Sequence, residues 1–169
     1  WSVTFRPSLH IPTAEVFNRP LRIGNGLDLT AGYRWTDPFQ LYAGFTYNLF
    51  DNEENAEEQI MELRQFGVLL GGRYFFKISP HQNNPFYLSA GLLFSSITSK
   101  SNDALFNFDT DASVGSQLGI GWELELTENW FFLPELRFSS LSNDYIIDGV
   151  SGTIALKYLS ITAALMHTF

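Results

Sequence analysis

Three histidines and 18 acidic side chains are the groups with which this 169-residue chain could do chemistry, because it contains no cysteine. The lack of cysteine excludes disulfides, thiolate metal ligands and a thiol nucleophile. His10, His81 and His167 fall on separate elements, far apart in the fold that the residue pattern predicts, so they cannot share one triad or one metal site. We expect no catalytic residue, no metal and no cofactor.

One acidic segment begins like a calcium-binding loop. Residues 109–113 read Asp-Thr-Asp-Ala-Ser, but the sixth loop position is Val114 where glycine is needed. The twelfth position is Ile120 where glutamate is needed, so the sequence excludes an EF-hand. We interpret the acidic run at 51–58 as a solvated loop, with loose binding of divalent cations as the alternative.

Charge and hydropathy narrow the class of protein. The formal net charge is -8 and the chain has 10 scattered Lys and Arg residues, whereas phosphate binding needs clustered basic residues. We therefore expect no nucleic-acid partner. The mean hydropathy is -0.03. The longest apolar runs, near 66–70 and 130–133, fall far short of the roughly 18 residues of a membrane-spanning helix.

The elements that position these residues are predicted by alternation, because strands place successive side chains on opposite faces. Over residues 27–35, one face carries Leu, Leu, Ala, Tyr and Trp while the other carries polar or small residues. The pattern continues along residues 1–169 as a single domain. It predicts an all-β fold of eight strands at about 1–10, 21–36, 39–50, 62–77, 85–99, 112–127, 130–142 and 152–169.

The predicted links between the strands alternate in length. Short turns lie at 36–38, 79–84 and 127–129, whereas longer, acidic loops lie near 11–20, 51–61, 100–111 and 143–151. In an up-and-down antiparallel barrel, this order places all short turns at one end and all long loops at the other. That asymmetry is typical of a transmembrane β-barrel.

The width of the barrel interior indicates which face of the strands points inward. The interior of an eight-stranded barrel is just wide enough for its own side chains. The polar face carries many small residues, so we expect it inside and the bulky apolar face outside, against lipid. Ordinary β-propensity is the alternative explanation for the aromatic side chains on these strands. We interpret those near the short turns as an interfacial girdle, comprising Trp1, Tyr33, Trp35, Tyr74 and Trp130.

With these patterns the chain resembles the small eight-stranded outer-membrane barrels of Gram-negative bacteria, the OmpA- and OmpX-like group and the related Bacteroidetes proteins. The chain's end alternates apolar residues up to the terminal aromatic, like the signal that the barrel-assembly machinery recognises; its residues are Ile161, Leu165 and Phe169. His167 stands where that family usually has an aromatic residue. The resemblance implies an integral outer-membrane location with periplasmic termini and turns, and extracellular loops. The partners that it implies are outer-membrane lipid and lipopolysaccharide, the assembly machinery and other envelope proteins.

Charged residues of inward parity are nearly balanced in sign. Since an unpaired buried ion is costly, we expect them to pair. The predicted network joins Glu123, Glu125 and Glu135 to Arg137 and Arg73, and it plugs the lumen. The alternative is a gated proton or ion path through the same residues. The full set is Arg6, Arg22, Asp28, Arg34, Arg73, Glu123, Glu125, Glu135 and Arg137.

The function that these features favour is non-enzymatic, as a structural, scaffolding or assembly subunit of an envelope or secretion complex. One alternative is a small channel or transporter, and another is a lipid A-modifying enzyme. The deacylases on comparable barrels use a His-x-Ser pair, whereas His10 here is followed by Pro12. Basic residues near the loop ends of strands, Arg64, Lys100 and Lys157, either contact lipopolysaccharide phosphates or snorkel at the membrane boundary.

Overall fold

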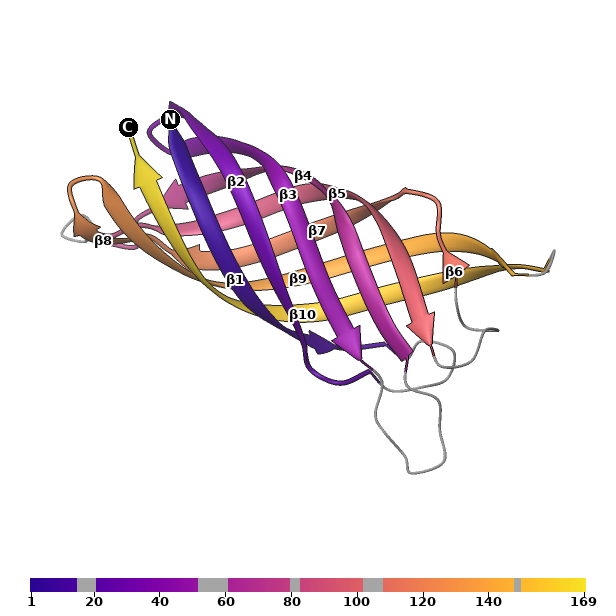
Figure 1. The fold of residues 1–169 in the computed structure, drawn as a ribbon. Helices are drawn as coiled ribbons and strands as arrows, with labels where there is room; N and C mark the ends of the chain where they lie inside the picture. The colour runs from indigo at the N-terminus through magenta and orange to yellow at the C-terminus, as the bar shows by residue number, and fades with distance from the viewer. Residues whose placement is uncertain (15–20, 52–60, 80–82, 102–107, 148–149) are drawn as a thin grey trace.

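The chain forms one antiparallel sheet that curls round and closes on itself (Figure 1). The computed structural model describes residues 1–14, 21–51, 61–79, 83–101, 108–147 and 150–169. Its strands are β1 (Ser2–Pro12), β2 (Gly24–Thr36), β3 (Phe39–Asp51), β4 (Met61–Phe76), β5 (Phe86–Ser101), β6 (Phe108–Asp109), β7 (Ser113–Trp122), β8 (Leu124–Thr127), β9 (Trp130–Ile147) and β10 (Val150–Thr168). Within these ranges, no helix is long and apolar enough to cross a membrane.

The wall of the barrel has eight strands, which confirms the predicted architecture. β7 and β8 form one wall strand that is interrupted at Glu123, and both pair with β9. β6 is a short addition that pairs only with β5. The barrel is closed because β10 pairs with β9 on one side and with β1 on the other.

The predicted long loop at 143–151 is wrong. The β9–β10 ladder continues to the pair Ile147 and Val150, so almost all of this segment is strand. The run 145–147 reads Tyr-Ile-Ile, which favours a strand, whereas the prediction gave more weight to the acidic residues. The hydroxyl of Thr153 donates a hydrogen bond of 2.8 Å to Asp144 across the ladder, so an acidic side chain stabilises the strand pair here.

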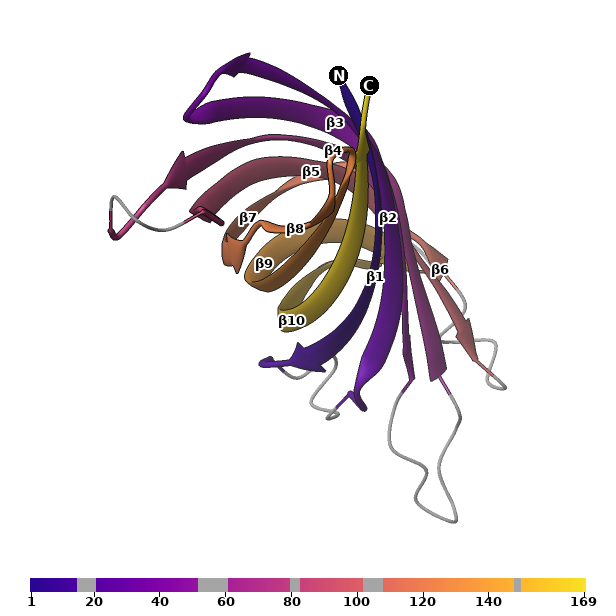
Figure 2. The same ribbon diagram turned by 90° about the vertical axis from the view of Figure 1, so that its left-hand side faces the viewer.

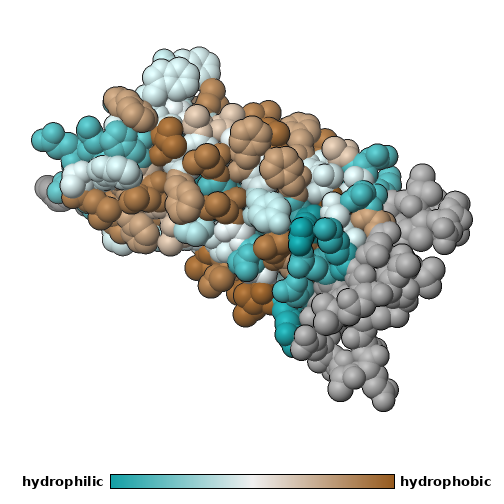
Figure 3. Space-filling model, viewed as in Figure 1, coloured by the Kyte–Doolittle hydropathy of each residue, from teal (hydrophilic) through white to brown (hydrophobic). Residues whose placement is uncertain are grey.

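The outward face of the wall is apolar, as predicted. Side chains alternate strictly between buried and exposed along β1. Phe5, Leu29 and Leu118 expose 50%, 51% and 63% of their surface. Figure 3 shows apolar side chains gathered in a broad brown band across the middle of the molecule, with hydrophilic surface towards its ends. This band is the surface expected to face lipid.

The chain termini meet at one end of the barrel, here called the terminal end (Figure 1, Figure 2). The amide of Phe169 donates a hydrogen bond of 3.0 Å to the carbonyl of Trp1. The ring of His167 packs against both Trp130 and Phe169, with ring centroids 4.7 Å apart in each case. His167 therefore takes the place of the expected aromatic residue by packing as a ring.

The residues of the predicted girdle and terminal signal lie on the outward face. The girdle residues Trp1, Tyr33, Trp35, Tyr74 and Trp130 are all exposed near the terminal end. The side chains of Ile161, Leu165 and Phe169 are also exposed. Their roles at a membrane interface and in assembly stay predictions.

The interior is less polar than expected, because two apolar layers close it. The loop-end apolar layer consists of Leu21, Phe50, Leu63, Ile97, Phe108, Leu141, Ile154, Leu156 and Tyr158. The terminal apolar layer consists of Phe75, Tyr87, Leu133, Ala164 and Met166, with Phe131 packed against it. Large apolar residues therefore face inward as well as outward, in addition to the polar interior that the sequence predicts.

Inward-facing glycines make room for the large interior side chains. The ring of Tyr42 lies where the Cβ atom of a larger residue at Gly71 would stand, and its hydroxyl lies 3.1 Å from the corresponding position at Gly91. The ring of Tyr87 fills the same kind of space at Gly121. A narrow barrel can thus hold large side chains only because neighbouring strands contribute none at these points.

The glycine at position 71 is therefore expected to be required for packing. Gly71→Val should lower the free energy of unfolding by about 1–3 kcal/mol, because the valine overpacks the space of Tyr42. Urea unfolding of the barrel in lipid vesicles measures this change. Gly72→Val is the matched control, since a Cβ atom there meets nothing closer than the edge of the Phe39 ring at 3.2 Å, and the carbonyl oxygen of Gln40 at 3.5 Å is in ordinary contact. Equal losses in both variants would contradict the packing argument.

Candidate functional site

Five buried charged residues form a band across the middle of the lumen, here called the central charge band. It consists of Arg6 on β1, Asp28 on β2, Arg73 on β4, and Glu135 and Arg137 on β9. Each exposes 5% of its surface or less. The strand period places them inside, because all of them fall on the inward parity of their strands.

Ion pairs in this band link β1, β2 and β9 through the lumen. Arg137 donates to Asp28 with Nη2 and Oδ2 2.8 Å apart, and these residues belong to strands that are not neighbours. Nη1 of Arg6 lies 3.4 Å from the same oxygen of Asp28, and its Nε lies 3.4 Å from Oε2 of Glu135. The hydroxyl of Ser89 donates a hydrogen bond of 2.5 Å to Glu135. The pairs cross-link the lumen rather than line an open path.

Arg73 has a different environment from the other two arginines. Its Nη1 donates a hydrogen bond of 2.8 Å to the side-chain oxygen of Gln40, whose amide in turn donates to Ser2. Its guanidinium carbon lies 4.9 Å from the ring centre of Tyr42 and 5.5 Å from that of Tyr87. Among the described side chains, no carboxylate forms an ion pair with Arg73.

The predicted ion-pair partners are wrong for all three glutamates, since Glu135 pairs with Arg6 rather than with Arg73 or Arg137. Glu123 pairs with Arg34 at 2.8 Å, not with Arg73 or Arg137. Glu125 is exposed and takes no part in the central charge band. The reason is that the ladder between β5 and β7 ends at Trp122, so Glu125 lies beyond the part of the wall that encloses the lumen. Arg22 is likewise exposed, ahead of the start of β2.

A layer of neutral hydrogen bonds lies on the loop side of the central charge band. Nε2 of His10 donates to the side-chain oxygen of Asn48 at 2.9 Å, and Ser160 donates to Nδ1 of His10 at 2.9 Å. The Asn48 amide donates to Gln65 and Tyr158 at 3.0 and 3.2 Å. Sequence reasoning missed these partners, although their polar character at inward positions is the signal that identifies them.

The histidines do not form a catalytic or metal site in the structure. His10 is buried with both ring nitrogens engaged, and His167 lies at the terminal end on the outer face. His81 and the acidic residues 52–58 lie outside the described residues. In the ranges that the structure covers, no group of three or more His, Cys, Asp or Glu side chains could hold a metal ion.

A charged hollow opens at the terminal end, here called the terminal vestibule, with a volume of about 530 Å³. The Arg34–Glu123 pair lies in it, and the guanidinium carbon of Arg34 lies 4.0 Å from the ring centre of Phe75. The backbone amide of Glu125 and the indole nitrogen of Trp122 donate to Asn84 at 3.1 Å each, which fixes the rim. Further charges on its lining are Asp37, Lys77 and Glu125.

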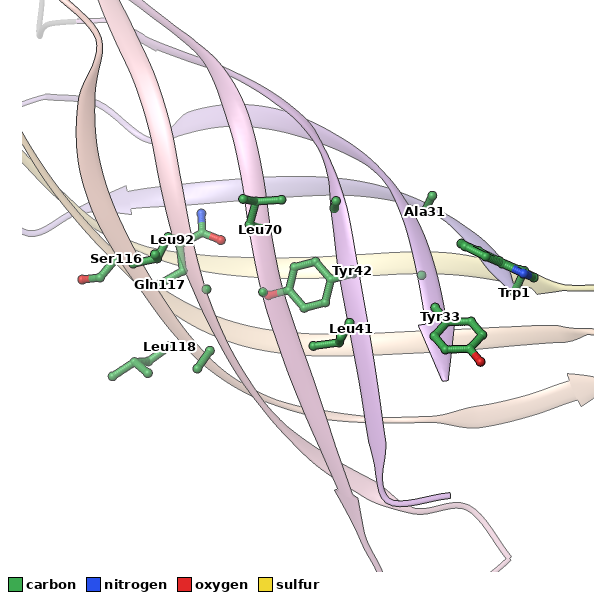
Figure 4. Close-up of a pocket in the computed structure, with 15 residues that line it drawn as sticks. Trp1, Ala31, Tyr33, Leu41, Tyr42, Leu70, Leu92, Ser116, Gln117 and Leu118 are labelled. Carbon is green, nitrogen blue, oxygen red and sulfur yellow. The ribbon is translucent and has the colours of Figure 1, made fainter. Parts of the chain in front are cut away.

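A second hollow, with a volume of about 840 Å³, lies on the outer wall (Figure 4). It runs from Trp1 and Tyr33, whose ring centroids are 5.0 Å apart, towards Leu118. Small residues such as Ala31, Ala43 and Ala90 make the wall concave here. Because its lining is mostly apolar, this groove extends the lipid-facing surface.

Comparison with known proteins places this geometry among barrels of one kind. Residues 7–159 match the family model described as "Outer membrane protein beta-barrel domain". No curated protein matches the chain in sequence.

Three solved structures share the fold at low sequence identity. Neisserial surface protein A is similar with a TM-score of 0.68 and 16% identity, over 99% of this chain and 96% of that chain. OprG from Pseudomonas aeruginosa gives 0.67 and 11%, over 99% and 95%. Outer Membrane Protein W from E. coli gives 0.55 and 11%, over 98% and 97%. At these identities, the likeness concerns the fold alone.

Asp28 is the carboxylate on which the central charge band depends most. Asp28→Asn should lower the free energy of unfolding by about 3–5 kcal/mol, because Arg6 and Arg137 both lose a charged partner inside the lumen. Chemical unfolding of the refolded barrel measures the loss. Glu125→Gln, which removes one exposed charge at the rim, should change stability by no more than about 0.5 kcal/mol. The role given to Asp28 fails if the two variants behave alike.

Proposed function

The chain belongs to the outer membrane protein β-barrel domain family, and from this premise we propose that it is a non-conducting barrel with a structural, scaffolding or assembly role. Membership makes it an integral protein of the bacterial outer membrane. Fold alone does not fix the role, so the proposal rests on the site.

The observation that carries the proposal is the closed lumen. The central charge band spans it between two apolar layers, and its ion pairs tie β1, β2 and β9 together. An ion that crossed would have to break these buried pairs and pass both apolar layers, each at a large desolvation cost. This arrangement favours a rigid plug over a channel.

The proposal includes an orientation, with both termini and the terminal vestibule in the periplasm. Exposed aromatic residues near the terminal end are suited to the headgroup level of the inner leaflet. The terminal vestibule would then face the periplasm with both signs of charge on its lining. Such a surface is suited to a protein partner with complementary charges, and it is the surface through which we propose that envelope proteins bind.

Lipid and the assembly machinery are the other proposed partners. The exposed apolar band fits the hydrocarbon core of the membrane. Arg64 pairs with Glu62, so Lys100 and Lys157 are the basic side chains near the loop end that we propose for lipopolysaccharide phosphates. The exposed side chain of Phe169, at the closing strand, supports its role in the assembly signal.

A non-enzymatic role is also part of the proposal. A lipid-modifying enzyme needs a nucleophile and a base that both reach lipid. His10, the one histidine beside serine hydroxyls among the described residues, is buried with them inside the lumen. That location supports a structural use of His10.

The plugged lumen predicts an absence of conductance. The purified barrel, inserted in a planar bilayer in concentrated KCl, should give no stable current steps, because the buried ion pairs and apolar layers block the path. A wide porin recorded in the same bilayers serves as the positive control. A large, stable pore in the unmodified protein would favour the channel alternative and contradict the proposal that the lumen is plugged.

The assembly role predicts a protein partner at the terminal vestibule. A photo-crosslinking residue at Lys77 should capture a defined envelope protein in native outer membranes, because Lys77 lines this hollow. The same crosslinker at Leu118 on the outer wall is the matched control and should capture no such protein. If the barrel is purified alone, and the crosslinker captures no stoichiometric partner at Lys77 or at Leu118, the assembly role is contradicted.

A further inference from the structure

All three arginines in the central charge band keep hydrogen-bond donors that no described protein group accepts, although in Arg137 this is Nε alone. Arg6 and Arg73 each expose 1% of their surface. Nη2 of Arg6 and both Nε and Nη2 of Arg73 have no hydrogen-bond partner. Buried donors are normally satisfied, and donors on a charged group are the most costly to leave unpaired. These nitrogens therefore require an acceptor.

The central charge band also carries an excess of positive charge. Three arginines, Arg6, Arg73 and Arg137, face two carboxylates, Asp28 and Glu135, which leaves one uncompensated positive charge. A third buried carboxylate, Glu123, does not balance it, because Glu123 interacts more strongly with Arg34 than with Arg73.

The excess charge is localised at Arg73. Both carboxylates of the band contact Arg6 or Arg137, whereas Arg73 has only the neutral oxygen of Gln40. Arg6 lies close enough to Arg73 for their like charges to repel. The rings of Tyr42 and Tyr87 attract the guanidinium of Arg73, but such contacts use the face of the group and leave its in-plane N–H donors without an acceptor.

A further donor comes from β5. The hydroxyl of Tyr87 is buried without a hydrogen-bond partner, and this side chain interacts electrostatically with both Arg6 and Arg73. Three strands therefore direct unpaired donors into the same region, with one net positive charge. Donors from several strands around one excess charge are the features of an anion site.

We propose that the lumen binds one monovalent anion, chloride under physiological conditions, between Arg6 and Arg73 near the hydroxyl of Tyr87. One negative charge balances the band, whereas a divalent anion would overcompensate it. The ligand must be small, because the two apolar layers close the lumen and tyrosine rings fill the space beside the inward glycines. Such an anion is enclosed as the barrel forms and stabilises the folded state.

Bromide is the probe that tests this site, because it replaces chloride and scatters X-rays anomalously. Crystals grown in sodium bromide should show an anomalous peak within contact distance of Arg73. In unfolding experiments at fixed ionic strength, replacing gluconate by bromide should lower the equilibrium constant for unfolding. Above the dissociation constant of bromide, each tenfold rise in bromide concentration should lower that equilibrium constant about tenfold. No peak at Arg73, together with equal stability in gluconate and bromide, would show that water satisfies the donors and would overturn the proposal.

The variant Gln40→Glu supplies the negative charge covalently. Gln40 already accepts a hydrogen bond from Arg73, so the nearly isosteric glutamate should compensate Arg73 in place of the anion. We expect this variant to fold, to be less sensitive to the choice of gluconate or bromide, and to lose the anomalous peak. Asn129→Asp adds the same charge at an exposed turn and should keep the full bromide dependence. A bromide dependence that Gln40→Glu leaves unchanged would contradict a site at Arg73.

Discussion

The closure of the sheet is the constraint on which the rest of this structure depends. In the hydrocarbon core of a membrane, no water satisfies the backbone, so a sheet that crosses it must have no free edge. The pairing of β10 with β1 removes that edge. Once the sheet is closed, the two faces of every strand lie in different environments. The outer face meets lipid, and the inner face encloses a space only as wide as its own side chains.

That narrow space explains why charge is tolerated in the lumen and also why it is cross-linked. Buried ions are costly unless they are paired, and Arg137 reaches Asp28 across the barrel to form such a pair. The apolar layers on either side keep water from the pairs, which strengthens them. The same layers would make any leak of ions slow. The interior therefore acts as a core in the sense of a soluble protein, built from both polar and apolar residues.

Much of the fold could be predicted from the sequence, because a period of two residues fixes both the strand and its outward face. The interior could not be predicted as well. Parity identified Arg6 and Asp28 as inward residues, but it says nothing of which inward residues share a level, since that depends on the register between strands. The pattern misplaces Glu125 because the alternation continues past the point where pairing with β5 ends. The pattern does not predict Phe50 and Leu63 in the interior, because small inward residues indicate a narrow lumen but do not show which large side chains occupy the space beside inward glycines.

The seam between β1 and β10 has a consequence for how the barrel forms. It brings together residues far apart in the sequence, such as His10 and Ser160, which are 150 residues apart. Contacts of this kind form late, because a long stretch of chain must be ordered before they can stabilise anything. The seam is completed by β10, the last strand of the barrel in chain order, so the barrel can close only after all its other strands have been synthesised. Until then the sheet keeps two open edges. Such edges can pair with strands of other chains, so they have to be protected from the surroundings until the barrel closes.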